Sequence, residues 1–173
     1  MGLSFGQTVD LTELALRHCF QITLLSSLSG LPLKQNIAVT GAVNQNGEIL
    51  PVGGVNEKIE GFFRTCKAQG LDGTQGALIP SRNRHHLMLS QDVVDAVAQG
   101  QFHIYTAEHA SEGAELLMGT VFGKELKGGS YEAQSILALA DKTLQAYRRA
   151  CHKEPAQSVR HMSHKFQKQL DGK

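Results

Sequence analysis

The sequence predicts an α/β fold in one compact domain. Short apolar or β-branched runs alternate along the chain with longer segments whose apolar residues recur every three or four positions. This is the pattern of strands alternating with helices. Glycine and proline separate the segments. The 173 residues, 41% of them hydrophobic, suffice for one core and are few for two.

The chain opens with a predicted helix and a predicted β-hairpin. Apolar residues through 11–29 have the spacing of a largely buried helix, which ends at Gly30. The β-branched run 35–43 and the apolar run 48–54 then flank the turn sequence NQNG. We therefore expect a hairpin over 37–52.

A second helix follows the hairpin, over 55–69, and Gly70 ends it. Its apolar side chains fall on one stripe, which predicts that this face packs on the core. The stripe consists of Val55, Ile59, Phe62, Phe63 and Cys66.

Strand and helix alternate through the next fifty residues. We expect a short buried strand over 76–80, followed by a segment 81–89 whose first residue is a serine suited to N-capping. A helix over 90–100, a strand over 102–107 and a helix over 109–119 complete the alternation.

Composition changes near residue 125. We expect a domain over 1–123, followed over 124–173 by a linker, a separate amphipathic helix (131–153) and a polar, basic, frayed tail. The helix either packs on this domain or on a neighbouring subunit, and the sequence leaves both arrangements open.

Composition argues against several classes of function. With 17 basic and 16 acidic residues, net charge +1, no global field favours nucleic acid or a membrane surface. No apolar run approaches the ~20 residues of a membrane span, and no secretory signal is visible. Three cysteines without a C-x-x-C pair indicate reduced thiols in a cytoplasmic protein. No P-loop, G-x-G-x-x-G or H-x-x-x-H pattern occurs, so we expect neither a cofactor nor a metal in this chain.

Lys58 is the residue that most invites a chemical interpretation. It lies one turn into the helix 55–69, on the side of Val55 and Phe62. A lysine that loses water there becomes easier to deprotonate, and a neutral amine can activate a serine hydroxyl. The commoner alternative is a lysine that buries its stem and keeps its ammonium in water.

The segment PLKQNIAVTGAVNQNGEILPVGGVNEKIEGFFRTCKAQGL, followed by GALIPSRN, closely resembles the proteolytic domain of Lon-type (protease La) serine proteases, especially bacterial Lon-related homologs. The resemblance covers about residues 30–118. It implies the Lon proteolytic fold, a mixed sheet with flanking helices. The family's T-G-x-V-x-x-x-G-x-[IV]-x-P-[IV]-G-G-[LV]-x-E-K pattern is present without a gap.

This resemblance implies a role for each matched residue. Lys58 falls on the base of a Ser-Lys dyad, and Thr40 is expected within hydrogen-bond reach of its amine. Gly41, the pair Gly53–Gly54 and Glu57 are supporting positions of the same motif.

The nucleophile position departs from the family pattern. The serine should lie 43 residues before Lys58, and Ala15 stands there instead, without the small residues that usually surround it. Three explanations are open: a naturally degenerate, inactive member, an altered nucleophile region, or an active full-length protein whose N-terminal stretch is rewritten or misread here. With Ala15 at the serine position, we expect the chain as given to be inactive.

The resemblance also implies partners. We expect protein or peptide substrates, an ATPase module outside this chain that would bind ATP, and a homo-oligomer in the form of a hexameric ring. An alternative is a non-catalytic assembly or peptide-binding module on the same fold. A third is a small α/β domain in which the lysine motif arose by chance.

Overall fold

The computed structural model describes residues 21–153, so the first part of the predicted helix 11–29, including Ala15, and the tail 154–173 lie outside the described residues. Residues 21–29 are helical. The later elements are β1 (Ile37–Val39), β2 (Ala42–Val43), β3 (Ile49–Leu50), α2 (Val55–Gln69), β4 (Gly76–Pro80), the 3-10 helix η1 (Ser81–His86), α3 (Gln91–Ala98), β5 (His103–Ala107), α4 (Ala110–Met118) and α5 (Ile136–Lys153).

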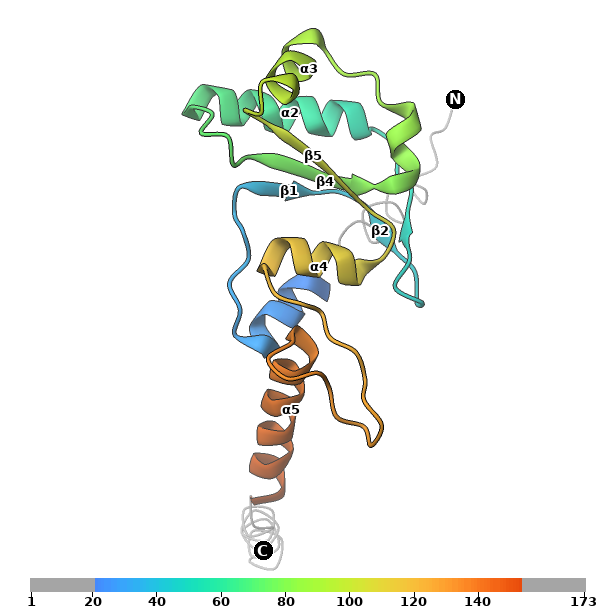
Figure 1. Ribbon diagram of the computed structural model, residues 1–173, viewed down its shortest axis with the longest axis vertical. Helices are drawn as coiled ribbons and strands as arrows, with labels where there is room; N and C mark the ends of the chain where they lie inside the picture. The colour runs from blue at the N-terminus through green and yellow to red at the C-terminus, as the bar shows by residue number, and fades with distance from the viewer. Residues whose placement is uncertain (1–20, 154–173) are drawn as a thin grey trace, which may run out of the picture.

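A three-stranded parallel sheet in the order β1-β4-β5 forms the centre of the domain. All five residues of β4 are buried, as a strand with neighbours on both edges and helices on both faces requires. Figure 1 shows α2 and α3 on one face of the sheet and α4 with the helical segment 21–29 on the other. The predicted α/β fold is confirmed.

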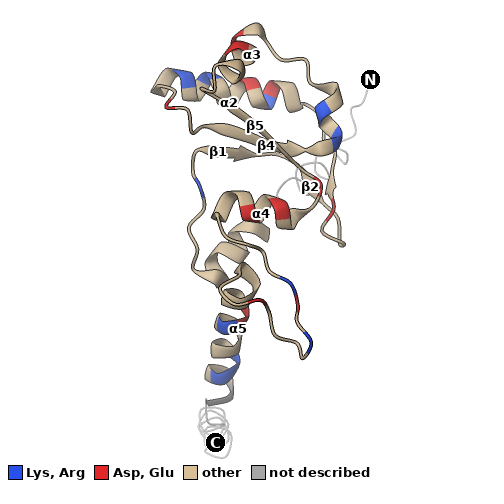
Figure 2. Cartoon of the chain, viewed as in Figure 1, with Lys and Arg blue, Asp and Glu red and all other residues tan. Residues whose placement is uncertain are grey.

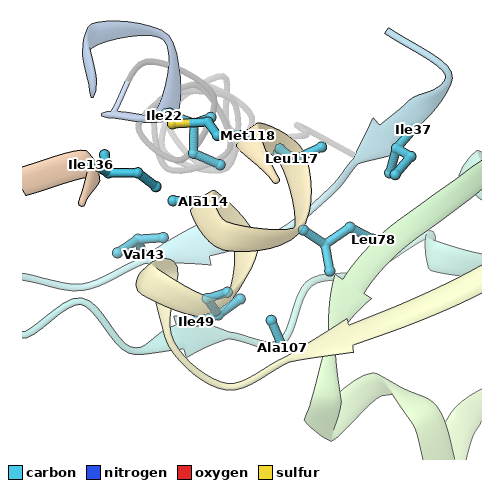
Figure 3. Close-up of a cluster of buried hydrophobic side chains, with 10 residues drawn as sticks. All are labelled: Ile22, Ile37, Val43, Ile49, Leu78, Ala107, Ala114, Leu117, Met118 and Ile136. Carbon is cyan, nitrogen blue, oxygen red and sulfur yellow. The ribbon is translucent and has the colours of Figure 1, made fainter. Parts of the chain in front are cut away.

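Alternate residues of β4 supply two separate cores. Leu78 packs with residues of α4, the hairpin and the segment 21–29 (Figure 3). Ala77 and Ile79 pack on the other face, against α2 and α3. Phe102 lies fully buried in this second core, with its ring 5.3 Å from that of Phe63 in an edge-to-face contact.

The predicted hairpin is smaller than expected. The run 35–43 is not one strand: β1 pairs in parallel with β4, and only β2 pairs with β3 in an antiparallel hairpin. Gly41 separates the two, with a φ of 154° that glycine adopts more readily than other residues. A side chain there would meet Ile49 Cγ2 at 3.1 Å. A β-branched run predicts strand conformation, but it carries no information about the partner.

The other elements between residues 55 and 119 match their predicted ranges closely. One detail differs in the segment 81–89: Ser81 is the first residue of η1, and its hydroxyl makes no capping bond to that helix. Gly119 ends α4 in the left-handed conformation, in agreement with the sequence pattern.

The last helix begins five residues later than predicted. Glu125 and Tyr131 form an antiparallel bridge, and α5 starts at Ile136. The residue before it, Ser135, accepts a hydrogen bond from the Ala138 amide at its Oγ. Ile136 and Ala140 are buried, so the first turns pack on this domain. The rest of α5 extends away from the sheet (Figure 1), with Leu144 and Tyr147 exposed. Among residues 21–153, no helix is both long and apolar enough to span a bilayer.

Replacing Phe102 by alanine should lower the free energy of unfolding by about 3–5 kcal/mol, because it removes a fully buried ring and leaves a cavity. Urea denaturation followed by circular dichroism measures the change. Met88, 84% exposed, is the control, and Met88→Ala should change stability by less than about 0.5 kcal/mol. Similar effects of the two substitutions would contradict the assigned core.

Candidate active site

Thr40 stands at the carboxyl end of β1, where the backbone holds it against the central strand. Its amide donates a 3.0 Å hydrogen bond to the carbonyl of Leu78, which extends the β1–β4 pairing by one residue. Thr40 is half-buried. The next residue, Gly41, turns the chain out of the sheet, so Thr40 is the last residue that lies beside β4.

Lys58 reaches this point from the first turn of α2. Its amide donates to the carbonyl of Gly54 at 3.1 Å, the first bond of the helix. Its Nζ donates to Thr40 Oγ1 at 3.3 Å. The sequence-based prediction that the two side chains lie within hydrogen-bond reach is therefore confirmed. Among the described residues the Lys58 side chain is exposed, so it does not pack into the core with the apolar side chains of α2.

The supporting residues of the motif shape the approach to this contact. Gly54 precedes α2 in the left-handed conformation, with φ 67°. Glu57 is exposed in the first turn of α2, where a carboxylate complements the positive end of the helix dipole. Within residues 21–153, no side chain caps this helix N-terminus.

Sequence reasoning missed the role of Asn83. The residue closes the ALIPSRN segment that carries part of the family resemblance, and the local sequence pattern indicates no role for it. Its Oδ1 accepts from the Val52 amide at 3.0 Å, and its Nδ2 donates to the Val52 carbonyl at 2.9 Å. A single amide side chain thus satisfies both backbone groups of one loop residue.

Three other side chains that could act as nucleophiles are engaged away from Lys58, namely Ser26, Ser29 and Cys66. The hydroxyls of Ser26 and Ser29 donate to the carbonyls of Leu31 and Leu25, at 2.6 and 2.7 Å. Cys66 is buried on the core side of α2, and burial raises the pKa of its thiol. Ala15, the position of the expected nucleophile, lies outside the described residues, so its distance from Lys58 stays untested.

A hollow of about 410 Å³ lies at the same edge of the sheet, beyond the carboxyl ends of β4 and β5. Its charged lining is mixed, and Figure 2 marks acidic positions along α4 and basic positions just after β4. The lining includes Glu108, Glu112 and Arg82 but neither Thr40 nor Lys58. Among residues 21–153, no group of three or more histidine, cysteine or acidic side chains has the geometry of a metal site.

A family profile of the Lon protease C-terminal proteolytic domain matches residues 18–119, more than half of the chain. The chain belongs to this family. The match contains Thr40, Lys58 and Asn83. The resemblance expected from the T-G and G-G-V-N-E-K segments is thus confirmed at the level of the family.

Several curated relatives support this Lon-type assignment. A Lon protease homolog of Haemophilus influenzae is 43% identical over 122 residues, 70% of this chain and 20% of its own length. One from Escherichia coli K12 is 44% identical over 120 residues, 69% of this chain and 19% of its own length. An archaeal Lon protease from Archaeoglobus fulgidus is 30% identical over 89 residues, 51% of this chain and 12% of that protein. The chain therefore spans about a fifth of the two more similar relatives.

In this Lon-type domain, Gly54→Ala should destabilise the fold by about 1–2 kcal/mol, because an L-residue is strained at φ 67°. Gly61, inside the same helix, is the matched control. A side chain there meets nothing within 4 Å, so Gly61→Ala should stabilise by about 0.5–1 kcal/mol. Urea denaturation of both variants measures the two shifts. The same sign for both would contradict the assigned start of α2.

Proposed function

We propose that this chain is the proteolytic domain of an ATP-dependent Lon-type serine protease, built for a Ser-Lys dyad in which Lys58 is the base. The 3.3 Å contact from Lys58 Nζ to Thr40 Oγ1 is the observation that supports it most directly. A threonine hydroxyl at this distance holds the lysine rotamer and accepts a hydrogen bond from one of the amine N–H groups. The remaining hydrogen-bonding capacity of the lysine nitrogen can serve the hydroxyl of a nucleophile.

The chemistry of a complete dyad follows from these parts. Neutral lysine takes the proton of a serine hydroxyl as the oxygen attacks a peptide carbonyl. Backbone N–H groups stabilise the oxyanion. The lysine then returns the proton to the leaving amine, and water hydrolyses the acyl-enzyme. This scheme needs no metal.

We further propose that the chain as given does not cleave peptides. Ala15 occupies the position 43 residues before Lys58 where the family carries its serine. A methyl group has no proton to give and no lone pair to attack with, so no acyl-enzyme forms. A domain that keeps Lys58 and lacks the serine also fits a second function, a non-catalytic assembly or peptide-binding module on the Lon fold.

The partners follow from the same proposal. The two more similar relatives are about five times as long as the matched segment, which leaves room in a full-length protein for an ATPase module that binds ATP and delivers unfolded substrates. We also propose a cytoplasmic location and assembly into a hexameric ring. Sedimentation velocity of the purified chain measures whether this domain associates by itself.

Incubation with casein, with and without ATP, should give no cleavage, and a fluorophosphonate-type serine probe should label no residue. Gel electrophoresis and peptide mass spectrometry measure both. Binding of unlabelled casein without cleavage would favour the binding module over an idle protease domain.

Lys67 supplies the matched control, since it lies on the same helix, is exposed and pairs with Asp92 at 2.9 Å. Robust cleavage that Lys58→Ala abolishes and Lys67→Ala preserves would overturn the inactivity and would reveal a serine that the sequence pattern does not identify. Cleavage insensitive to Lys58→Ala would overturn the dyad itself.

A further inference from the structure

The segment from Ser81 to Ser90 is tied along one side of α2. Three residues spaced four apart, Val52, Asn56 and Glu60, each bond to it. Val52 pairs with Asn83 as described. Asn56 Oδ1 accepts from the Met88 amide at 3.0 Å, and Glu60 Oε1 accepts from the Ser90 amide at 2.9 Å. Because Asn56 and Glu60, four residues apart, lie on one face of α2, their bonds set the rotation of the helix about its axis, and the bonds to Val52 hold the loop that precedes it.

Asn83 makes the bond nearest to the start of the helix, and it has two features that the others lack. It uses both its acceptor and its donor on the same residue, Val52, at 3.0 and 2.9 Å. Both bonds are partly buried, so a substitution that removes them strands an amide and a carbonyl away from water. Val52 lies between β3 and α2, outside any strand.

The connection from Val52 to the start of α2 is poorly constrained without this bond. Gly53 and Gly54 connect Val52 to α2, and glycine allows more backbone conformations than any other residue. The helix that follows has no side-chain cap at its N-terminus from the part of the chain that the structure describes. Asn83 therefore restrains the loop at the residue where its freedom begins.

Both partners of the Lys58–Thr40 contact take their position from β4 and its continuation. The amide of Thr40 bonds to Leu78 within β4. Val52, at the other end of the glycine pair, bonds to Asn83, three residues after Pro80. β4 and the residues after it therefore hold both groups. The Thr40 hydroxyl is held through the bond to Leu78, and the Lys58 amine is held through the bonds of Asn83 to Val52.

We propose that Asn83 is a positioning residue that holds the Lys58 amine against the Thr40 hydroxyl. The proposal rests on the proposed function, because it gives the base of the dyad its geometry. It requires no nucleophile and no turnover, so it applies to this chain whether or not the chain cleaves peptides.

The test is a nuclear Overhauser cross-peak between the Lys58 ε-methylene and the Thr40 methyl group in the full chain. Asn83→Asp keeps an acceptor but loses the donor to the Val52 carbonyl, and Asn83→Ala loses both. Each should lose the cross-peak while the amides of α2 keep their helical shifts. Asn36→Ala is the matched control: Asn36 also ties a loop through its amide, to the Thr74 carbonyl at 2.8 Å, and its removal should leave the cross-peak intact.

A cross-peak of wild-type intensity in folded Asn83→Asp would overturn the proposal. Unfolding of both Asn83 variants would also overturn it, because the residue would then act on the stability of the whole domain. Failure of the proposed function is a separate result: retained proteolysis in Lys58→Ala would remove the dyad and leave the outcome of the cross-peak measurement unchanged.

Discussion

The hydrogen-bonded ladders on the two edges of β4 hold the rest of this domain in place. β1 and β5 pair with β4 in parallel, in the registers Val39↔Leu78 and Pro80↔Ala107. Parallel pairing brings the carboxyl ends of all three strands to one edge. Thr40, Ser81 and Glu108 are the first residues beyond the strands there. The candidate site and the charged hollow share this edge, as in other open α/β sheets.

The two cores depend on the same strand. Leu78 faces the α4 side and Ile79 the α2 side, both almost fully buried. A helix on each face is needed because β4 has no polar side to expose. Packing on the α2 side therefore brings the helix that carries Lys58 against the sheet, and packing on the α4 side seats the helical segment 21–29.

Local polar contacts then fix the rotation of α2 on the sheet, which apolar packing alone does not determine. Apolar contacts of Ile59 and Phe63 hold α2 on the sheet, but such contacts are non-directional and allow a helix to slide or rotate. The side-chain bonds of Asn83, Asn56 and Glu60 are directional, and they select one rotation. That rotation points the exposed Lys58 side chain toward Thr40.

The sequence by itself determined most helix and strand ranges through periodicity and glycine positions, and one family-specific pattern indicated the site residues. The ranges of α2, β4, α3, β5 and α4 follow from local spacing of apolar residues and from the glycines that end them, because these signals act over a few neighbouring residues. The Lys58–Thr40 contact followed from resemblance, since eighteen residues of strand, turn and helix leave their separation open. Only the tertiary structure decided that the run 35–43 divides between two sheets at Gly41. It also decided that α5 begins after the bridge Glu125↔Tyr131, and that the Asn83 side chain bonds to the backbone of Val52. The division at Gly41 and the Asn83–Val52 bonds depend on pairing between residues distant in the chain, and local sequence patterns do not identify such partners.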